Sequence, residues 1–183
     1  MSNDSLVKLN VGCGNRKLEG FINIDACSYC EPDLVLDLDN GLGEFEDDSV
    51  DQIRAEHVLE HVDDLAFVLK EMFRVSKSGA RWDIYVPHYS YGFAHPFHKR
   101  GFSRIAFNFF DLDPKKTYCG QLGLDVDEFR FNYTRSSSGI PFLMGKGISF
   151  IANLHPGFCE RIWCYIVGGF EEIYFRITVR KAA

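Results

Sequence analysis

The feature that most constrains this chain is a strand that stops in two glycines and is soon followed by an acidic residue. Leu6 to Val11 is rich in apolar residues and predicts a buried strand, and Gly12-Cys13-Gly14 follows it directly. Glycines at such a turn let the backbone approach a ligand closely. The next predicted strand, Phe21 to Asp25, ends in a carboxylate, which in open α/β sheets can bind both hydroxyls of a ribose. The two strands together predict a nucleotide-like ligand.

The spacing within this region favours an adenosyl ligand over a dinucleotide. Gly14 and Asp25 are only eleven positions apart, and the third glycine of the dinucleotide fingerprint is absent. Only Asn15 to Gly20 separate the glycine loop from the next strand, whereas a parallel crossover normally needs a dozen residues or more. Six extended residues span at most about 20 Å, which allows a parallel return but no full helix. We therefore expect a shortened first crossover.

The middle of the chain predicts three further strands and one helix. The strands are expected at Asp33 to Leu38, Val50 to Ala55 and Arg81 to Pro87. Apolar residues recur with helical spacing from Leu65 to Val75, which predicts an amphipathic helix with one buried face. Asp63 or Asp64 would cap its start, and Gly79 would stop it.

The last part of the chain predicts a short helix, a strand, a broken helix and a final strand. The short helix would run from a cap at Ser103 to Phe110, and the strand would cover Glu128 to Thr134. Ile148 to Ile166 has helical character but is interrupted at His155-Pro156-Gly157. Ile173 to Val179 alternates apolar and polar residues, which is typical of a strand with one covered face.

Size and composition indicate one folded domain, residues 1–183, with 46% hydrophobic residues. We expect no membrane span and no export signal, because no apolar run is long enough and the first residues lack a basic flank before an apolar core. The six cysteines are then most simply reduced thiols of a cytoplasmic protein. A net charge of −6 argues against a general nucleic-acid binder, which would carry a basic face.

Five segments, in this order, resemble the class I S-adenosylmethionine-dependent methyltransferases. They are Leu9–Gly14, Gly20–Asp25, Asp33–Leu38, His57–His61 and Arg74–Gly79. The resemblance covers roughly residues 6 to 100 and is strongest to a small bacterial and archaeal branch known mainly as predicted methyltransferases. It implies a Rossmann-like α/β fold, with a mostly parallel sheet and an antiparallel C-terminal strand, and S-adenosylmethionine as cofactor. The shortened first crossover departs from the family, whose first helix normally follows the glycine loop.

The resemblance also implies where cofactor and acceptor bind. The implied cofactor-binding residues are Asn10, Gly12, Cys13, Gly14, Asp25, Asp37, Leu38, Glu56 and His57. The methyl group would then point towards the ends of the fourth and fifth strands, where His57 and His88 are candidate catalytic bases. The aromatic segment Tyr89 to Arg100 follows directly, and we expect His95, His98 and Arg100 to bind the acceptor.

A competing motif lies in the same region. His57-Val58-Leu59-Glu60-His61 matches the pattern of the inverted zinc peptidases, in which two histidines four residues apart face one metal ion. No third ligand is evident from the sequence, and Cys27 and Cys30 have no second pair at matching spacing. We therefore expect no bound metal, and Glu60 and His61 would instead fix the turn into the following helix.

Two functions from different classes remain. The first is a cytoplasmic methyltransferase that methylates an oxygen of a small molecule or a sugar-containing intermediate, because no Asn-Pro-Pro-Tyr-type motif of amino methylation follows the fourth strand. The second is a non-catalytic adenosyl-binding or scaffold protein on the same fold, which the shortened first crossover favours.

Overall fold

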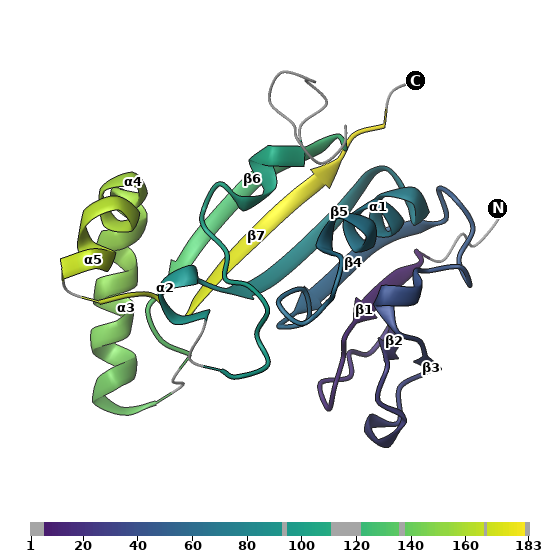
Figure 1. Ribbon diagram of the computed structural model, residues 1–183, viewed down its shortest axis with the longest axis horizontal. Coiled ribbons are helices and arrows are strands. Elements are labelled where there is room, and N and C mark those ends of the chain that lie inside the picture. Colours follow the sequence, from purple (N-terminus) through teal and green to yellow (C-terminus); the bar gives the residue numbers. More distant parts are fainter. Residues whose placement is uncertain (1–5, 93–94, 111–121, 136–137, 167, 182–183) are drawn as a thin grey trace.

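One mixed sheet organises the structure (Figure 1). The computed structural model describes residues 6–92, 95–110, 122–135, 138–166 and 168–181. The strands within these ranges are β1 Lys8–Val11, β2 Ile22–Asp25, β3 Leu34–Val35, β4 Val50–Glu56, β5 Ser76–Pro87, β6 Leu124–Asn132 and β7 Glu172–Val179. Their order is β3-β2-β1-β4-β5-β7-β6, with β1 to β5 parallel and β7 antiparallel to both β5 and β6. The predicted Rossmann-like sheet with an antiparallel C-terminal strand is confirmed.

Helices are concentrated in the second half of the chain. The α-helices of the described residues are α1 Leu65–Val75, α2 Tyr89–Gly92, α3 Gly139–Leu154, α4 Pro156–Phe158 and α5 Cys164–Ile166. Shorter turns are η1 Ser28–Cys30, η2 Leu38–Asn40, η3 Ala106–Phe110 and the π-helical η4 Cys159–Trp163. α1 packs on β5 (Figure 1) with a buried stripe that matches its predicted helical spacing. The stripe consists of Val68, Leu69, Met72 and Val75.

The connection between β1 and β2 contains no helix, as its length predicted. The Cys13 N–H donates to the Ile24 carbonyl at 2.9 Å, which continues the pairing of the two strands into the glycine loop. The buried amide of Asn10 donates to the Arg16 carbonyl and to Asn23 Oδ1, each at 2.9 Å. A buried side-chain network therefore holds this loop in the place where a helix would normally follow.

The central strands bury one face and expose charge on the other. In β4, the fully buried Ile53 and Ala55 alternate with polar side chains that point to the opposite face. On that face Asp83 accepts hydrogen bonds from the Tyr174 hydroxyl at 2.6 Å and from Arg81 at 2.7 Å. The same surface includes Gln52, Arg54, Tyr85, Arg130, Asn132 and Arg176. The hydrophobic core therefore lies on the α1 side of the sheet.

The junction between α1 and β5 differs from the prediction. α1 ends at Val75, and β5 begins at Ser76 and not at Arg81. The buried Ser76 hydroxyl accepts a hydrogen bond from the Trp82 indole at 2.9 Å and fixes the start of the strand. Gly79, predicted to stop the helix, lies inside β5 with φ +86°, where the register against β4 shifts. A glycine with a left-handed backbone is found in β-bulges as well as at helix ends, so the sequence alone does not show which of the two Gly79 forms.

Three other predicted elements have different bounds. β3 pairs over Leu34–Val35 only, because the chain turns into η2 before the predicted end at Leu38. The strand predicted over Glu128 to Thr134 is β6, which begins earlier, at Leu124. The helix predicted after Ser103 is the single 3₁₀ turn η3.

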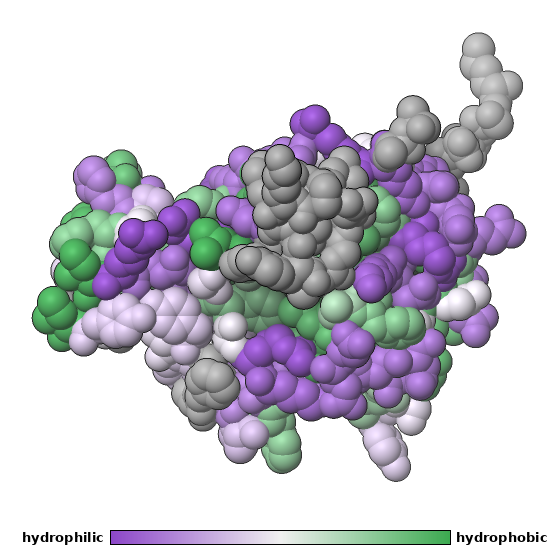
Figure 2. Space-filling model, turned by 45° about the horizontal axis from the view of Figure 1, so that its top comes forward, coloured by the Kyte–Doolittle hydropathy of each residue, from purple (hydrophilic) through white to green (hydrophobic). Residues whose placement is uncertain are grey.

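The segment α3 to α5 carries an exposed apolar surface. α3 begins at Gly139, well before the predicted Ile148. The sequence hides this first part of the helix because Gly145 and Gly147 interrupt its helical pattern. The predicted break at His155 is confirmed. Figure 2 shows hydrophobic side chains gathered at this end of the molecule. Those exposed include Leu143, Met144, Phe150, Ile151, Leu154, Phe158, Ile162 and Ile166. Within the described residues, the structure has no helix with the length and apolar character needed to cross a membrane.

The N-cap of α1 gives a first test of the fold. Asp64 Oδ1 accepts a hydrogen bond from the Phe67 N–H at 3.0 Å. Of the two predicted residues, Asp64 is therefore the N-cap of α1. We expect Asp64→Ala to lower the free energy of unfolding by about 1 kcal/mol, because a helix-end N–H loses its partner. Asp64→Ser, which keeps an acceptor, should recover most of this loss. Urea unfolding measures both, and equal stability of the alanine and wild-type proteins would contradict the assignment.

Candidate active site

The glycine loop and the end of β2 form the first part of the site. Gly12 and Gly14 have φ values of +64° and +47°, and a Cβ at Gly12 would overlap the Val58 side chain. The Asp25 carboxylate accepts the Gly14 N–H at 2.7 Å and the Cys27 N–H at 2.8 Å, one on each oxygen. A carboxylate has about four acceptor positions, so two remain for a ligand. The predicted pairing of glycine loop and acid therefore exists in the structure.

A groove of about 160 Å³ lies beside Asp25. Asp37 and Leu38 line it together with Gly12 and Asp25, so the structure brings these four predicted residues together. The Asp37 carboxylate also accepts the Asp39 N–H at 3.0 Å and begins the η2 turn. Apolar side chains complete the groove, contributed by Leu36, Val58 and Val62. Asp25 can accept hydrogen bonds from hydroxyl groups and lies next to an apolar groove. This combination suits a ribose and the adenine attached to it.

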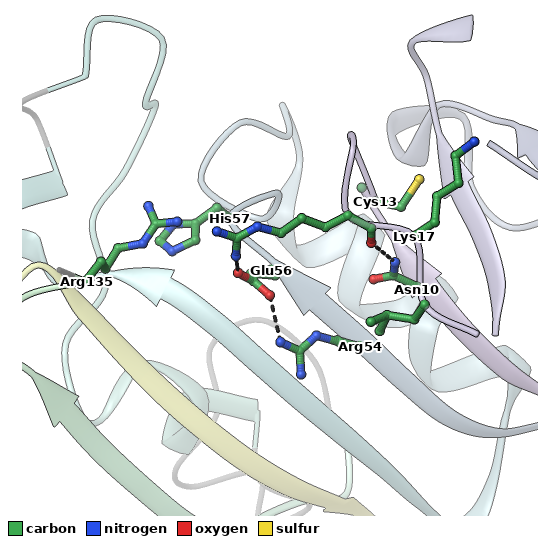
Figure 3. Close-up of a pocket in the computed structure, with 10 residues that line it drawn as sticks. Asn10, Cys13, Lys17, Arg54, Glu56, His57 and Arg135 are labelled. Atoms are coloured by element: carbon green, nitrogen blue, oxygen red, sulfur yellow. Dashed lines mark hydrogen bonds and ion pairs between the residues drawn. The ribbon is translucent and has the colours of Figure 1, made fainter. Parts of the chain in front are cut away.

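A second cavity, of about 460 Å³, opens on the other side of the glycine loop. Figure 3 shows Arg135, His57 and Glu56 on one side of it, and Asn10, Cys13 and Lys17 on the other. Four cationic side chains line this cavity, namely Arg16, Lys17, Arg54 and Arg135. Glu56 forms ion pairs with Arg16 and, at 2.7 Å, with Arg54. The cavity therefore offers partners of both signs, as the carboxylate and ammonium of an amino acid require.

A third cavity, of about 450 Å³, is lined by histidines. It contains three of the predicted residues, His57, His95 and His98, together with His61 and Arg135. The second and third cavities share His57 and Arg135, and the groove shares Gly12 with the second cavity and His61 with the third. All three lie at the carboxyl ends of β1, β2 and β4, where ligands of open α/β sheets bind.

His57 occupies the junction of the second and third cavities. Its backbone is left-handed, with φ +53°, and both ring nitrogens have carboxylate partners. Nδ1 lies 3.1 Å from Glu60 Oε1, and Nε2 lies 2.7 Å from Glu172 Oε2. Burial alone would lower the pKa of His57, but the hydrogen bonds to Glu172 and Glu60 outweigh it and raise the pKa. A cationic imidazole that donates to both acids has no free lone pair, so it cannot act as a base before it has lost a proton.

His88, the other predicted base, lies inside the core. It is 0% exposed, and it lines none of the three cavities. Its Nδ1 lies 2.6 Å from the Ser90 hydroxyl, and its ring packs against Tyr89, Phe131 and Phe170. A fully buried imidazole cannot reach an acceptor in this conformation. The structure therefore does not place His88 in the site, and we interpret it as a structural residue.

Arg100 has a structural position and not the predicted acceptor-binding one. Its guanidinium donates to the carbonyls of Leu59, Val62 and Asp63 at 2.9, 2.6 and 3.1 Å. These contacts use three of the five N–H donors of the guanidinium, so Arg100 fixes the turn that follows β4. Arg135, which the sequence interpretation missed, supplies a cation to the cavity instead. Phe93 and Ala94 of the predicted aromatic segment lie outside the described residues.

Other important residues carried weak sequence signals. Arg16 and Lys17 directly follow the glycine loop, and their position could have been read as a replacement for the missing helix terminus. Glu172 is the first residue of β7, next to an ordinary alternating pattern, and belongs to no motif. Burial by itself would raise the pKa of Glu172, but the hydrogen bonds from His57 and Asn132 lower it more, so this acid stays charged beside His57.

The comparisons with known proteins agree with this geometry. Residues 9–82 match the model of a family described as a methyltransferase domain. A search of curated proteins finds no match to the sequence. The fold resembles an S-adenosylmethionine-dependent methyltransferase from Archaeoglobus fulgidus, with a TM-score of 0.58 and 18% identity over 94% of this chain and 86% of that one.

Two further solved structures share the fold. One is an S-adenosylmethionine-dependent methyltransferase from Mesorhizobium loti, with a TM-score of 0.59 and 12% identity over 95% of this chain and 91% of that one. The other is geranyl diphosphate C-methyltransferase from Streptomyces coelicolor A3(2), solved with S-adenosylhomocysteine, with a TM-score of 0.57 and 14% identity over 96% and 69% of the two chains.

Residues 9–82 thus match a methyltransferase domain, and the chain has the fold of the S-adenosylmethionine-dependent methyltransferases. The site fits this cofactor: Asp25 offers acceptor positions for the ribose hydroxyls, the apolar groove suits the adenine, and the second cavity suits the amino-acid end. The His57–His61 motif lies inside the matched domain, which favours the methyltransferase interpretation of this motif over the peptidase one.

The two glycines of the loop give a matched pair of variants. In Gly12→Ala the new methyl group overlaps Val58 and the backbone is strained, so we expect a stability loss of about 2–5 kcal/mol. In Gly14→Ala the backbone is also left-handed, but no atom lies within 4 Å of the new Cβ, so the loss should be only about 1–2 kcal/mol. Urea unfolding compares them. Equal losses would mean that Gly12 is not in contact with Val58.

Proposed function

We propose that the enzyme transfers the methyl group of S-adenosylmethionine to an oxygen of a small, anionic acceptor bound in the histidine-lined cavity. The observation that carries this proposal is the meeting of that cavity with the cofactor-binding surfaces at Gly12 and His57. An acceptor in the third cavity would lie next to the amino-acid end of the cofactor, where the transferable methyl is attached. Its volume of about 450 Å³ is that of a small-molecule site.

The chain's residues mainly have to align the two reactants. When bound, S-adenosylmethionine supplies a methyl group on a positively charged sulfur, which is an excellent leaving group. Alignment of the reactants alone can lower the activation free energy by several kcal/mol. His57 and its two acids, Glu60 and Glu172, form a rigid hydrogen-bonded row between the cavities, and this row fixes the wall against which both reactants would lie.

Arg135 favours an anionic acceptor in the third cavity, which is also lined by the carboxylate of Glu171. Arg135 is its cationic side chain and has an exposed position, with its Nε 3.8 Å from Glu172. Arginine binds carboxylates and phosphates through paired N–H donors. The motif typical of amino methylation is absent after β4, which supports oxygen as the methylated atom.

Cofactor binding tests the first half of this proposal. We expect S-adenosylhomocysteine to bind with a dissociation constant in the micromolar range. Asp25→Ala should weaken binding at least about tenfold, because the ribose hydroxyls lose a charged acceptor worth roughly 1.5–3 kcal/mol per hydrogen bond. Asp33→Ala is the matched control, since Asp33 accepts from the Asn23 backbone and side chain and does not line the groove. Isothermal calorimetry decides, and equal weakening by both variants would contradict the assigned role of Asp25.

Methyl transfer tests the second half. Protein supplied with ¹³C-methyl S-adenosylmethionine should methylate members of a panel of hydroxy acids and sugar phosphates, and the methyl chemical shift identifies the methylated atom. His57→Ala should lower turnover about 100-fold and leave S-adenosylhomocysteine affinity within a few fold, because it removes the group that orders Glu60 and Glu172. His155→Ala, which removes an exposed histidine, serves as control. Cofactor binding without transfer to any class of acceptor, or transfer only to amines, would overturn the proposal.

A further inference from the structure

We propose that Glu60, His61 and His98 bind a divalent transition metal ion of the zinc type at the wall of the histidine-lined cavity. One ligand atom from each of the three side chains lies within 4.8 Å of the others. The sequence motif contained Glu60 and His61 but no third ligand, and that gap was the reason to expect no metal. The tertiary structure supplies His98 from the segment after β5.

The first supporting observation is an unsatisfied oxygen. Glu60 is 0% exposed, and within the described residues its Oε2 has no hydrogen-bond partner. The other oxygen, Oε1, lies 3.1 Å from His57 Nδ1 and 3.8 Å from His98 Nε2. Buried carboxylate oxygens are rarely left without a partner, because the lost contacts with water must be replaced. A cation between Glu60 and the two histidines would supply that replacement.

The second observation is the hydrogen bond of His61. Its Nδ1 lies 3.1 Å from the Phe97 carbonyl, and a carbonyl can only accept, so Nδ1 carries the proton. In the neutral ring Nε2 then has a free lone pair. Metal-binding histidines typically donate their other ring N–H to a backbone carbonyl or a carboxylate in this way. The hydrogen bond therefore selects the tautomer that a metal ion requires.

The third observation is the way His98 is held against the motif. The backbone N–H of Lys99 donates to the Glu60 carbonyl at 2.9 Å, and the Lys99 ammonium pairs with Asp63. Arg100 binds three carbonyls of the same turn. The rings of His61 and His98 lie 4.9 Å apart, centroid to centroid. Two residues on the C-terminal side of His98 thus fix its backbone, so little reorganisation would be needed to complete the site.

The donor set indicates the class of metal. Two imidazoles and one carboxylate are typical ligands of zinc and similar transition metals, whereas magnesium prefers oxygen ligands. Three protein ligands leave a coordination position open, as in catalytic zinc sites. His61 and His98 both line the third cavity, so an acceptor there could reach that position.

The catalytic use of the metal rests on the proposed oxygen methylation, whereas metal binding itself does not. A hydroxyl group bound at the open position would have a lowered pKa and release its proton to solvent. Its oxygen lone pair then forms the new carbon–oxygen bond while the carbon–sulfur bond breaks, and neutral S-adenosylhomocysteine leaves. This gives the acceptor a route to deprotonation that His57, held between two acids, does not offer in this conformation.

Metal titration tests the proposal directly. The full-length protein, treated with chelator and dialysed, should take up one zinc ion per chain in elemental analysis and bind zinc chloride with micromolar or tighter affinity in calorimetry. A His61→Ala/His98→Ala double variant should weaken this binding at least about 100-fold. His155→Ala also removes a histidine, but an exposed one outside the cluster, and should bind zinc as the wild type does. Excess magnesium should not displace the zinc.

The outcomes separate the metal site from the proposed function. No zinc uptake by the wild type, or unchanged uptake by the double variant, would overturn the metal site. Unfolding curves show whether the variants remain folded, and Glu60→Gln, which keeps the side-chain shape, gives an independent variant that should also bind zinc more weakly. S-adenosylhomocysteine binding is measured on the same samples. Cofactor binding without zinc binding rejects only the metal site, and zinc binding without cofactor binding rejects only the proposed function.

Discussion

The rest of the structure depends on the seven residues, Asn15 to Phe21, that join the glycine loop to β2. They form no helix, one face of the central sheet carries charged side chains, and the core lies on the α1 side. The loop is held by the buried amide of Asn10 in place of helix packing. A short connection has thus been compensated by hydrogen bonds between side chains and backbone, which keep Gly12 and Asp25 in the arrangement that a ligand requires.

The same short connection changes the electrostatics of the site. In a longer methyltransferase the helix after the glycine loop would direct its N-terminal N–H groups, with their partial positive charge, towards the cofactor. Here the cavity next to the loop contains arginine and lysine side chains from the loop itself, from β4 and from the segment after β6. These cationic side chains can supply the positive charge that the helix terminus would otherwise provide.

The turn after β4 joins the two halves of the site. Its motif contributes His57 towards the cofactor side and Glu60 and His61 towards the acceptor side, and Arg100 binds the carbonyls between them. Two residues from outside the motif complete the cluster, namely Glu172 on β7 and His98 in the segment after β5. A few polar contacts between segments far apart in the sequence therefore determine which side chains of this motif are available to a ligand.

The sequence by itself determined the positions of the first strands along the chain, the helix-free crossover and the pairing of the glycine loop with Asp25, because these depend on residue spacing and local conformation. Only the tertiary structure decided the roles of the histidines and arginines. His88 and Arg100 had the expected positions in the chain, but burial and backbone contacts remove them from the acceptor cavity. Arg135, Glu172 and His98 meet the motif after β4 through long-range packing. Side-chain convergence of this kind leaves no periodic or spacing signal, since the partners come from separate elements.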